Sequence, residues 1–452
     1  MRAEQNAILT DCQAGTPMGD LYRRYWVPAM MTSELPERAG PPVRITLLGE
    51  ELVAFRDAEG AIGMLDEFCP HRGTSLFFGR NSRLDQVGGP GLRCVYHGWK
   101  FDVNGSCVDM PNEPADSSFK SKTKTRAAYP CVERGGVVWV FMGEPGTEPE
   151  LPELEWVNIP DEQRYISKRM QFSNSVQSME GGIDASHANV LHQDIALWDT
   201  IGEFERFSGN ALDASSPNFF VEETDFGLII SAQRRRENGQ SYWRFTQWIM
   251  PWFSILTHDG SDKTIGAHAW VPIDNERCFT WTINYHPERN VTEEERHYWT
   301  KGGGLHSELL PNSLVPTLNR ENDYGINRSL QATHSMTGIP NVGMQDAAVQ
   351  ENMGPWVDRD RRHLGSRASR YRERLGAADA PIIAARRLLL AAATSLEKDP
   401  TIRPPGLLPE DQRQAFALES QVLPGDADWA AAKAASGAGK ERKDRPAQAN
   451  SD

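Results

Sequence analysis

The chain has 452 residues and a formal net charge of −14 at neutral pH. This length suits one large domain with a smaller one, or two interlocked domains, and the acidic balance argues against nucleic acid or an anionic membrane as the main partner. The sequence shows no signal peptide and no run of about 18 apolar residues, so we expect a cytoplasmic protein without a membrane span. The six cysteines are too few and too scattered for a disulfide scaffold, which leaves metal ligation or ordinary burial.

The first third of the chain is rich in short strand patterns. Residues 43–65 alternate apolar and polar positions between glycine-containing turns, which is typical of antiparallel strands, and residues 135–143 close this region. Residues 144–156 are rich in proline and glutamate and favour an extended connector. We therefore expect a domain boundary near residue 150.

The remainder mixes strands and helices. Residues 278–285 alternate aromatic with polar side chains and predict a strand with one buried face. Residues 380–397 predict an amphipathic helix with Arg386 and Arg387 on its polar face. Residues 436–452 are small, charged and non-aromatic, and predict a disordered tail. The fold class expected from these patterns is α+β with an antiparallel sheet.

Two short motifs carry metal-ligating residue types. Cys69 and His71 lie in "CPHRG", Cys94 and His97 lie in "CVYHGWK", and 22 residues separate the two halves. Such paired spacings suit either a structural zinc ion or a [2Fe–2S] cluster of the Rieske type, and the spacing alone does not choose between them. A glycine beside each pair favours the cluster, because clamping loops must bring their backbone N–H groups close to its sulfides.

With this flanking sequence, "CPHRG" and "CVYHGWKFD" resemble the signature of the Rieske non-heme iron aromatic-ring oxygenases. The segments "GTPMGDLYRRYWVPA" and "VDMPNEP" extend the likeness, in the manner of the phthalate-dioxygenase-like branch, and it covers residues 1 to about 435. The resemblance implies that Cys69 and Cys94 hold one iron of the cluster, and His71 and His97 the other. Residues 81–91 contain an apparent insertion between the two halves.

The same resemblance implies a division of the chain. A helical N-terminal part of the catalytic region would occupy residues 1–40, and a β-rich Rieske [2Fe–2S] domain residues 41–150. A mononuclear-iron catalytic domain would follow at 151–435, with an antiparallel sheet flanked by helices in a helix-grip arrangement.

A second set of candidate ligands lies in "EGGIDASHANVLHQD". His187 and His192 are five residues apart, about 500° around an ideal helix, and would converge only if a π-type turn widened the helix. Asp184 falls three residues before His187 and therefore on the same side of such a helix. The spacing matches the family's catalytic iron motif, in which the two histidines bind Fe(II) and the aspartate links them to a Rieske histidine of a neighbouring subunit. The other histidines, His268 among them, lack a paired spacing and are expected to be packed or exposed.

A facial triad of two histidines and one carboxylate needs a further acidic ligand. Asp323, Asp346 and Asp358 are the candidates downstream. We select Asp346, because its spacing from Glu351 resembles the family's third-ligand segment, and we expect Asp358 to be solvated.

One arginine in a strand-like segment of the second region is a candidate for binding the substrate. Arg244 alternates with aromatic residues in "SYWRFTQWIMPWF". It either makes a structural salt bridge or holds a substrate carboxylate in the pocket. In the second case Trp243, Phe245 and Trp248 would supply a stacking wall.

The function implied by the resemblance is that of an oxygenase component acting on a small aromatic acid. It would activate O2 at Fe(II) and dihydroxylate a phthalate- or benzoate-type ring, or alternatively remove an O-methyl group by monooxygenation. Electrons from NAD(P)H would come through a separate flavin/iron–sulfur reductase, because the chain has no glycine-rich dinucleotide fingerprint. A homotrimer or a hexamer of paired trimers is expected. A pure Rieske electron carrier is a further alternative, but such a carrier has no use for Asp184, His187 and His192.

Overall fold

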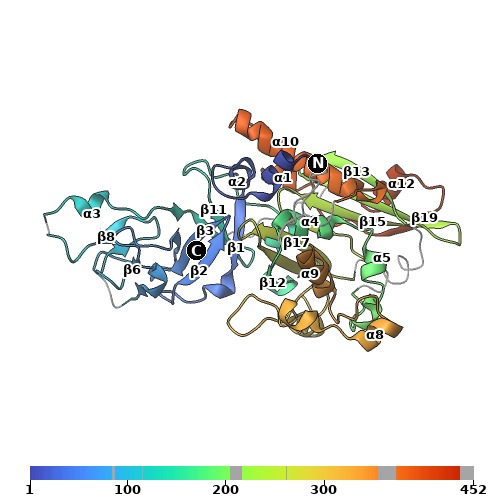
Figure 1. Cartoon of the computed structure of the whole chain (residues 1–452), viewed down its shortest axis with the longest axis horizontal. Helices are drawn as coiled ribbons and strands as arrows, with labels where there is room; N and C mark the ends of the chain where they lie inside the picture. Colours follow the sequence, from blue (N-terminus) through green and yellow to red (C-terminus); the bar gives the residue numbers. More distant parts are fainter. Residues whose placement is uncertain (84–86, 115, 204–215, 261, 355–372, 438–452) are drawn as a thin grey trace. The chain divides into compact units, whose positions relative to one another are not determined.

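The structure of the chain is a computed structural model, which describes residues 1–83, 87–114, 116–203, 216–260, 262–354 and 373–437. It contains two compact units: Cys12–Glu150, and Met1–Asp11 together with Leu151–Asp452 (Figure 1). Residues 438–452 of the expected tail, residues 84–86 of the expected insertion, and Asp358 lie outside the described residues.

The smaller unit consists of three small antiparallel sheets with strand orders β1-β11-β10, β2-β3-β4-β9 and β5-β6-β7-β8. Residues 12–40 belong to this unit, so the expectation that they accompany the catalytic region does not hold. The reason is that β1 pairs with the fully buried strand β11. The strands are β1 Trp26–Met31, β2 Val43–Leu47, β3 Glu50–Arg56, β4 Ile62–Asp66, β5 Arg80–Asn81, β6 Leu92–Arg93, β7 Lys100–Phe101, β8 Cys107–Asp109, β9 Ala128–Tyr129, β10 Cys131–Arg134 and β11 Val137–Phe141, with helices α2 Pro17–Tyr22 and α3 Phe119–Lys122.

The larger unit is built on one antiparallel sheet of order β12-β18-β17-β16-β15-β14-β13, with β19 paired to β15. This confirms the α+β class with an antiparallel sheet. The strands are β12 Arg164–Gln171, β13 Asn218–Thr224, β14 Gly227–Arg235, β15 Gln240–Ile249, β16 Phe253–Leu256, β17 Ile265–Pro272, β18 Cys278–Tyr285 and β19 Gln421–Pro424.

Helices pack against this sheet. The contacts join α4 to β17, α9 to α4, and α10 to α1, β13 and β14, and Figure 1 shows α10 running beside α1. None of the described helices is long and apolar enough to cross a membrane. The helices are α1 Ala3–Thr10, α4 Ser175–Ile183, α5 Ala188–Leu191, α7 Glu293–Thr300, α8 Arg328–Thr333, α9 Val342–Asn352, α10 Ala380–Lys398, α11 Pro409–Gln412 and α12 Trp429–Ala435.

The strand predicted at 278–285 is β18, but both of its faces are buried. On its aromatic face, the Tyr285 hydroxyl donates a hydrogen bond of 3.1 Å to Glu155 in a 3-10 turn at Glu155–Val157. Trp156 of that turn packs on Phe253 of the same sheet, with ring centroids 6.2 Å apart. Its polar face lines a cavity through Thr280 and Thr282. Buried polar side chains need hydrogen-bond partners inside the fold, and Thr280 finds one in Gln171 at 3.1 Å.

Candidate metal centres and active-site cavity

Two loops of the same form carry the cysteine–histidine pairs of the smaller unit. In each loop the cysteine carbonyl accepts a hydrogen bond from the glycine four residues later, at 2.9 Å between Cys69 and Gly73 and at 3.1 Å between Cys94 and Gly98. Both glycines have positive φ, 73° and 79°. Side chains rarely adopt this conformation, so glycine is what allows the loops to close around their cysteines.

The four side chains of these loops meet. The Cys69 and Cys94 sulfurs are within hydrogen-bonding range of each other. The imidazole centroids of His71 and His97 are 4.3 Å apart, and His71 also stacks on Trp99 at 4.3 Å. The Nδ1 atom of His71 is buried without a hydrogen-bond partner among the described residues. Two sulfurs and two imidazoles with an unsatisfied ring nitrogen are the donor set of a Rieske cluster, and the residues present fit that group.

The electrostatic environment of the two cysteines favours a thiolate at Cys94. The contact with Cys69, helped by the backbone N–H groups of Tyr96 and His97, lowers the pKa of Cys94 to about 6 against the opposing effect of burial. A thiolate is the form of cysteine that binds iron.

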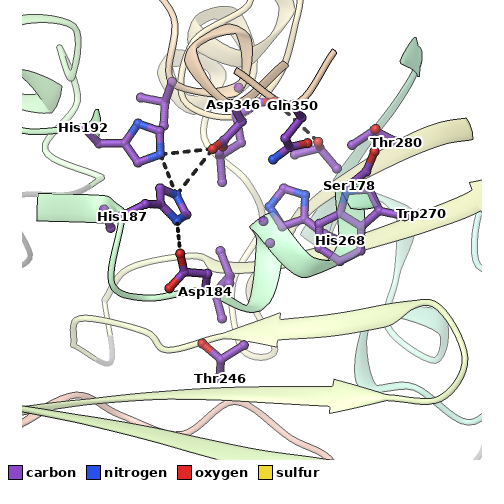
Figure 2. Close-up of a pocket in the computed structure, with 18 of the residues that line it drawn as sticks. Ser178, Asp184, His187, His192, Thr246, His268, Trp270, Thr280, Asp346 and Gln350 are labelled. Carbon is purple, nitrogen blue, oxygen red and sulfur yellow. Dashed lines mark hydrogen bonds and ion pairs between the residues drawn. The ribbon is translucent and has the colours of Figure 1, made fainter. Parts of the chain in front are cut away.

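In the larger unit, His187, His192 and Asp346 form a group whose ligand atoms lie within 4.8 Å of one another. The two Nε2 atoms are 3.2 Å apart, and each lies 3.4 Å from Oδ1 of Asp346 (Figure 2). Ligand atoms bound to one metal at about 2.1 Å and near right angles are about 3 Å apart. The three side chains therefore fit a facial triad, which leaves the remaining positions of a metal open.

The opposite ring nitrogens of both histidines have partners. Nδ1 of His187 lies 3.3 Å from Oδ2 of Asp184, and Nδ1 of His192 lies 2.7 Å from Oε1 of Gln345. Each acceptor holds the proton on Nδ1 and leaves the Nε2 lone pair for a metal. Gln345 was not predicted from the sequence, because nothing local to Asp346 indicates that its neighbour contacts His192.

The expected π-type widening between His187 and His192 is absent. His187 immediately precedes α5 and His192 immediately follows it, so the two rings come from opposite ends of a single short helix. The chain leaves α4 at Asp184, whose Oδ1 accepts hydrogen bonds from the N–H and hydroxyl of Ser186. This side-chain turn competes with helix continuation and separates α4 from α5.

Asp346 is the carboxylate that the structure brings to the histidines, from the buried helix α9. Asp323 lies in an exposed 3-10 segment, Arg320–Gly325, and belongs to no metal-compatible group among the described residues.

The charges of this group favour a bound cation. Burial alone would raise the pKa of Asp346, but the neighbouring imidazoles hold it well below its usual range. Burial would lower the pKa of His187, but the carboxylates of Asp184 and Asp346 raise it to about 10. Two carboxylates around two imidazoles thus attract positive charge, which a divalent metal supplies.

A cavity opens beside the triad on the polar face of the sheet. Its floor is formed by residues that face each other in register across the strands, with Trp270 opposite Thr280 and His268 opposite Thr282. Figure 2 shows His268 between the triad and Trp270. Burial lowers the pKa of His268 to about 4, so a neutral imidazole faces the cavity at pH 7. His268 is buried and belongs to no metal-compatible group among the described residues, as expected for a packed histidine, but no local pattern in the sequence indicated that it lines the cavity.

Arg244 also lines the cavity, together with Thr246 of the same strand. The expected stacking wall is not found. Trp243 and Phe245 alternate with Arg244 and face the other side of the sheet, and Trp248 is not among the described residues that line the cavity. Trp270 is the one indole among the described lining residues.

Replacing Gln345 by leucine should lower the iron affinity of the triad by about 10- to 100-fold. Leucine has about the volume of glutamine, but it lacks the oxygen that accepts a hydrogen bond from His192 and orients its ring. It also lacks the amide nitrogen that donates to Oδ1 of Asp194 at 3.2 Å. The measurement is iron binding to apoprotein by titration. Acid-labile sulfide should be unchanged, which separates this effect from general damage. Wild-type iron affinity in the variant would show that the hydrogen bond has no orienting role.

Comparisons with known proteins agree on one family. Residues 25–126 match the Rieske [2Fe-2S] domain, and residues 140–450 match the family described as "LigXa C-terminal domain like". The chain is 36% identical over 442 residues to the 3-chlorobenzoate-3,4-dioxygenase oxygenase subunit of Comamonas testosteroni, covering 94% of this chain and 96% of that protein. It is 34% identical to the phthalate 4,5-dioxygenase oxygenase subunit of Pseudomonas putida, covering 87% and 86%.

A shorter match joins the chain to a demethylase. Over 194 residues it is 40% identical to the 5,5'-dehydrodivanillate O-demethylase oxygenase subunit of a Sphingobium species, covering 42% of this chain and 44% of that protein. The structure of dicamba monooxygenase bound to 3,6-dichlorosalicylic acid shares the fold, with a TM-score of 0.56 at 19% identity, covering 83% of this chain and 98% of that one.

Proposed function

The chain belongs to the Rieske non-heme iron oxygenases as an oxygenase subunit with a [2Fe–2S] cluster and a mononuclear iron, and we propose that it hydroxylates the ring of an aromatic carboxylate. The observation that carries the proposal is the cavity that places Arg244 and Trp270 in the same space as His187, His192 and Asp346. An indole suits an aromatic ring, and a guanidinium suits a carboxylate. The chlorobenzoate and phthalate dioxygenase subunits named above act on such acids.

We propose the following roles for the ligating residues. Cys69 and Cys94 hold one iron of the cluster and His71 and His97 the other. His187, His192 and Asp346 bind the mononuclear iron. When bound, the cluster supplies single electrons and the mononuclear iron activates O2 beside the substrate.

The surrounding residues orient and shield the reacting groups. Asp184 and Gln345 fix the His187 and His192 rings with Nε2 facing the metal position. Arg244 would hold the substrate carboxylate, and Trp270 would flank the ring. We further propose that Asp184 also contacts a Rieske histidine of a neighbouring copy, because its side chain is 18% exposed beside His187 and remains reachable.

O-demethylation is the second candidate function. The 40% identity to the dehydrodivanillate O-demethylase subunit over 194 residues supports it. Ring hydroxylation and O-demethylation both require an aromatic acid beside the same iron. The roles proposed for the triad and for Arg244 are therefore the same in both reactions.

The family implies a separate electron-donating partner, and we propose a flavin/iron–sulfur reductase that takes electrons from NAD(P)H. We also propose a homotrimer or a pair of trimers, because the role of Asp184 needs a neighbouring copy. A cytoplasmic location would suit the chain, whose six cysteines are all unpaired.

Product identification tests the proposed function. The purified protein would be combined with a surrogate reductase, NADH and a panel of benzoates and methoxybenzoates. A ring diol from a benzoate supports dihydroxylation, whereas formaldehyde with a phenol from a methoxybenzoate supports O-demethylation. Turnover of neither class, with both metal centres loaded, would refute an aromatic acid substrate.

The metal content gives an independent prediction. Anaerobically purified protein should contain iron with acid-labile sulfide, and the reduced protein should show the paramagnetic signal of a His-ligated two-iron cluster. Replacing His71 by alanine should abolish that signal while the iron at His187 and His192 is largely retained. Stoichiometric zinc without sulfide would overturn the assignment.

Arg244 provides a test of substrate binding. Arg244→Ala should raise the KM for a benzoate-type substrate by about 10- to 100-fold, because a charge-assisted hydrogen bond contributes about 1.5–3 kcal/mol. The thermal midpoint should change little. A much lower midpoint with unchanged KM would mean that the arginine is structural.

A further inference from the structure

Asp194 is a buried carboxylate that is linked to His192 through the side chain of Gln345. Asp194 is 3% exposed and Gln345 is fully buried. Oε1 of Gln345 lies 2.7 Å from Nδ1 of His192, and Nε2 of Gln345 donates to Oδ1 of Asp194 at 3.2 Å. Asp194 belongs neither to the metal-compatible group nor to the described residues that line the cavity. It therefore touches the residue that orients a proposed iron ligand without facing the iron position itself.

Both hydrogens of the Gln345 amide are directed at groups that only accept. Nε2 donates to Oδ1 of Asp194 and, at 2.9 Å, to the carbonyl oxygen of Ile339. A carboxylate and a backbone carbonyl have lone pairs but no hydrogen to donate. If the amide turned over, its oxygen would face these two oxygens, so Oε1 is held toward His192.

The orientation of this amide decides which nitrogen of His192 carries the proton. With Oε1 facing the ring, Nδ1 donates and the lone pair of Nε2 remains free beside His187 and Asp346. With the amide reversed, Gln345 would donate to Nδ1, and a neutral imidazole would carry its proton on Nε2. That second tautomer has no lone pair on Nε2 for a metal.

The other contacts of Asp194 fix its position as an acceptor. Its Oδ2 accepts from the hydroxyl of Ser335 and, at 3.4 Å, from Nε1 of Trp198. The oxygen of Ser335 in turn accepts from the Gly338 N–H at 2.7 Å, which leaves its hydrogen for Asp194. Since Gln345 also donates to Asp194, the hydrogen bonds of the network end on this one carboxylate.

We infer that Asp194 is a positioning residue for the mononuclear iron: by holding the Gln345 amide in one orientation, it selects the tautomer of His192 that presents Nε2 to the metal. The inference rests on the proposed iron site. It requires that Asp194 affects iron binding through Gln345, so the effects of substituting the two residues should not be additive.

The experiment is a double-mutant cycle on Fe(II) affinity. Fe(II) would be titrated into protein with an intact cluster and an empty mononuclear site, for wild type, Asp194→Asn, Gln345→Leu and the double variant. Asparagine keeps the shape of aspartate, but its NH2 group can face Gln345 and permit the reversed amide. Asp194→Asn should weaken Fe(II) binding by about 10- to 100-fold. In the Gln345→Leu background the same substitution should change the affinity by less than about threefold.

A second measurement separates positioning from general damage. The paramagnetic signal of the nitric oxide complex of the mononuclear iron should change in Asp194→Asn, whereas sulfide content and thermal midpoint should match wild type. Asp199→Asn is the matched control, because Asp199 lies on the same segment and accepts from the Glu203 N–H at 2.8 Å. It should leave the Fe(II) affinity and the signal unchanged.

The outcomes separate the inference from the proposed function. Wild-type Fe(II) affinity in Asp194→Asn, or losses that multiply in the double variant, overturns the role of Asp194. A lower thermal midpoint with unchanged Fe(II) affinity makes Asp194 structural and also overturns it. If Asp194→Asn does not fold, Ser335→Ala carries the same cycle, because it leaves the carboxylate in place and removes the hydroxyl that holds it. Wild-type protein that binds no Fe(II) at this site refutes the proposed function instead.

Discussion

Replacing Asp184 by asparagine is expected to leave both metal centres loaded while turnover falls at least about 100-fold. Asparagine has nearly the same shape, but it removes the negative charge that lies 3.3 Å from Nδ1 of His187. It also removes the ionised group that we propose contacts a Rieske histidine of a neighbouring copy. Iron, sulfide and the cluster absorbance should match those of wild-type protein, and kcat with a surrogate reductase measures the loss.

Asp346→Ala is the matched control for Asp184→Asn, because it removes a proposed ligand instead of a proposed bridge. It should lose the mononuclear iron and retain sulfide. An active Asp184→Asn variant, or one that loses its iron as Asp346→Ala does, would contradict the role given to Asp184. The bridge also requires an oligomer, so activity in a strictly monomeric preparation would remove its basis.

The proposed cluster ligands and the two histidines proposed for the mononuclear iron could be suggested from the sequence, because their short spacings are local features that match the family's motifs. Cys69, His71, Cys94 and His97 lie on two closed loops, and the loop glycines Gly73 and Gly98 are visible in the motif. Asp346 is different, since it is more than 150 residues from His192 and was chosen among three aspartates by resemblance. Its approach to the histidines depends on how α9 packs against α4.

Gln345 escaped prediction because it is a common polar residue whose role comes from a contact with a distant segment, the imidazole of His192. The π-type turn was wrong because the spacing of His187 and His192 was interpreted on a continuous helix. The side-chain turn at Asp184 ends that helix first.

The alternating pattern of β18 shows what periodicity can and cannot predict about the fold. Its alternation identified the strand and its aromatic face, but polar residues on the other face suggested solvent. A cavity lined by Thr280 and Thr282 produces the same alternation as a solvated surface. Periodicity therefore located the sheet and could not distinguish an exposed face from an active-site face.

Replacing Arg386 by alanine is expected to lower the free energy of unfolding by about 3–5 kcal/mol. The helix predicted at 380–397 is α10, but Arg386 lies on its buried side instead of the polar side expected. Its guanidinium makes two hydrogen bonds of 2.7 Å to Glu180 and two of 2.6 Å to Glu373. Its removal leaves buried carboxylates without a counter-charge, and Glu180 lies in α4, which leads to Asp184. Urea unfolding followed by tryptophan fluorescence measures the loss.

The adjacent arginine of α10 is the matched control for this variant. The Arg387 side chain is 69% exposed and pairs with Glu223 at the surface, so Arg387→Ala should change the unfolding free energy by less than about 1 kcal/mol. Adding Glu180→Gln to Arg386→Ala should recover part of the loss, because it removes one of the unpaired charges. Equal effects of the two arginine substitutions would mean that Arg386 is not the buried charge on which α4 depends. The sequence alone does not distinguish these two neighbouring arginines, since the distinction comes from which side of α10 meets α4.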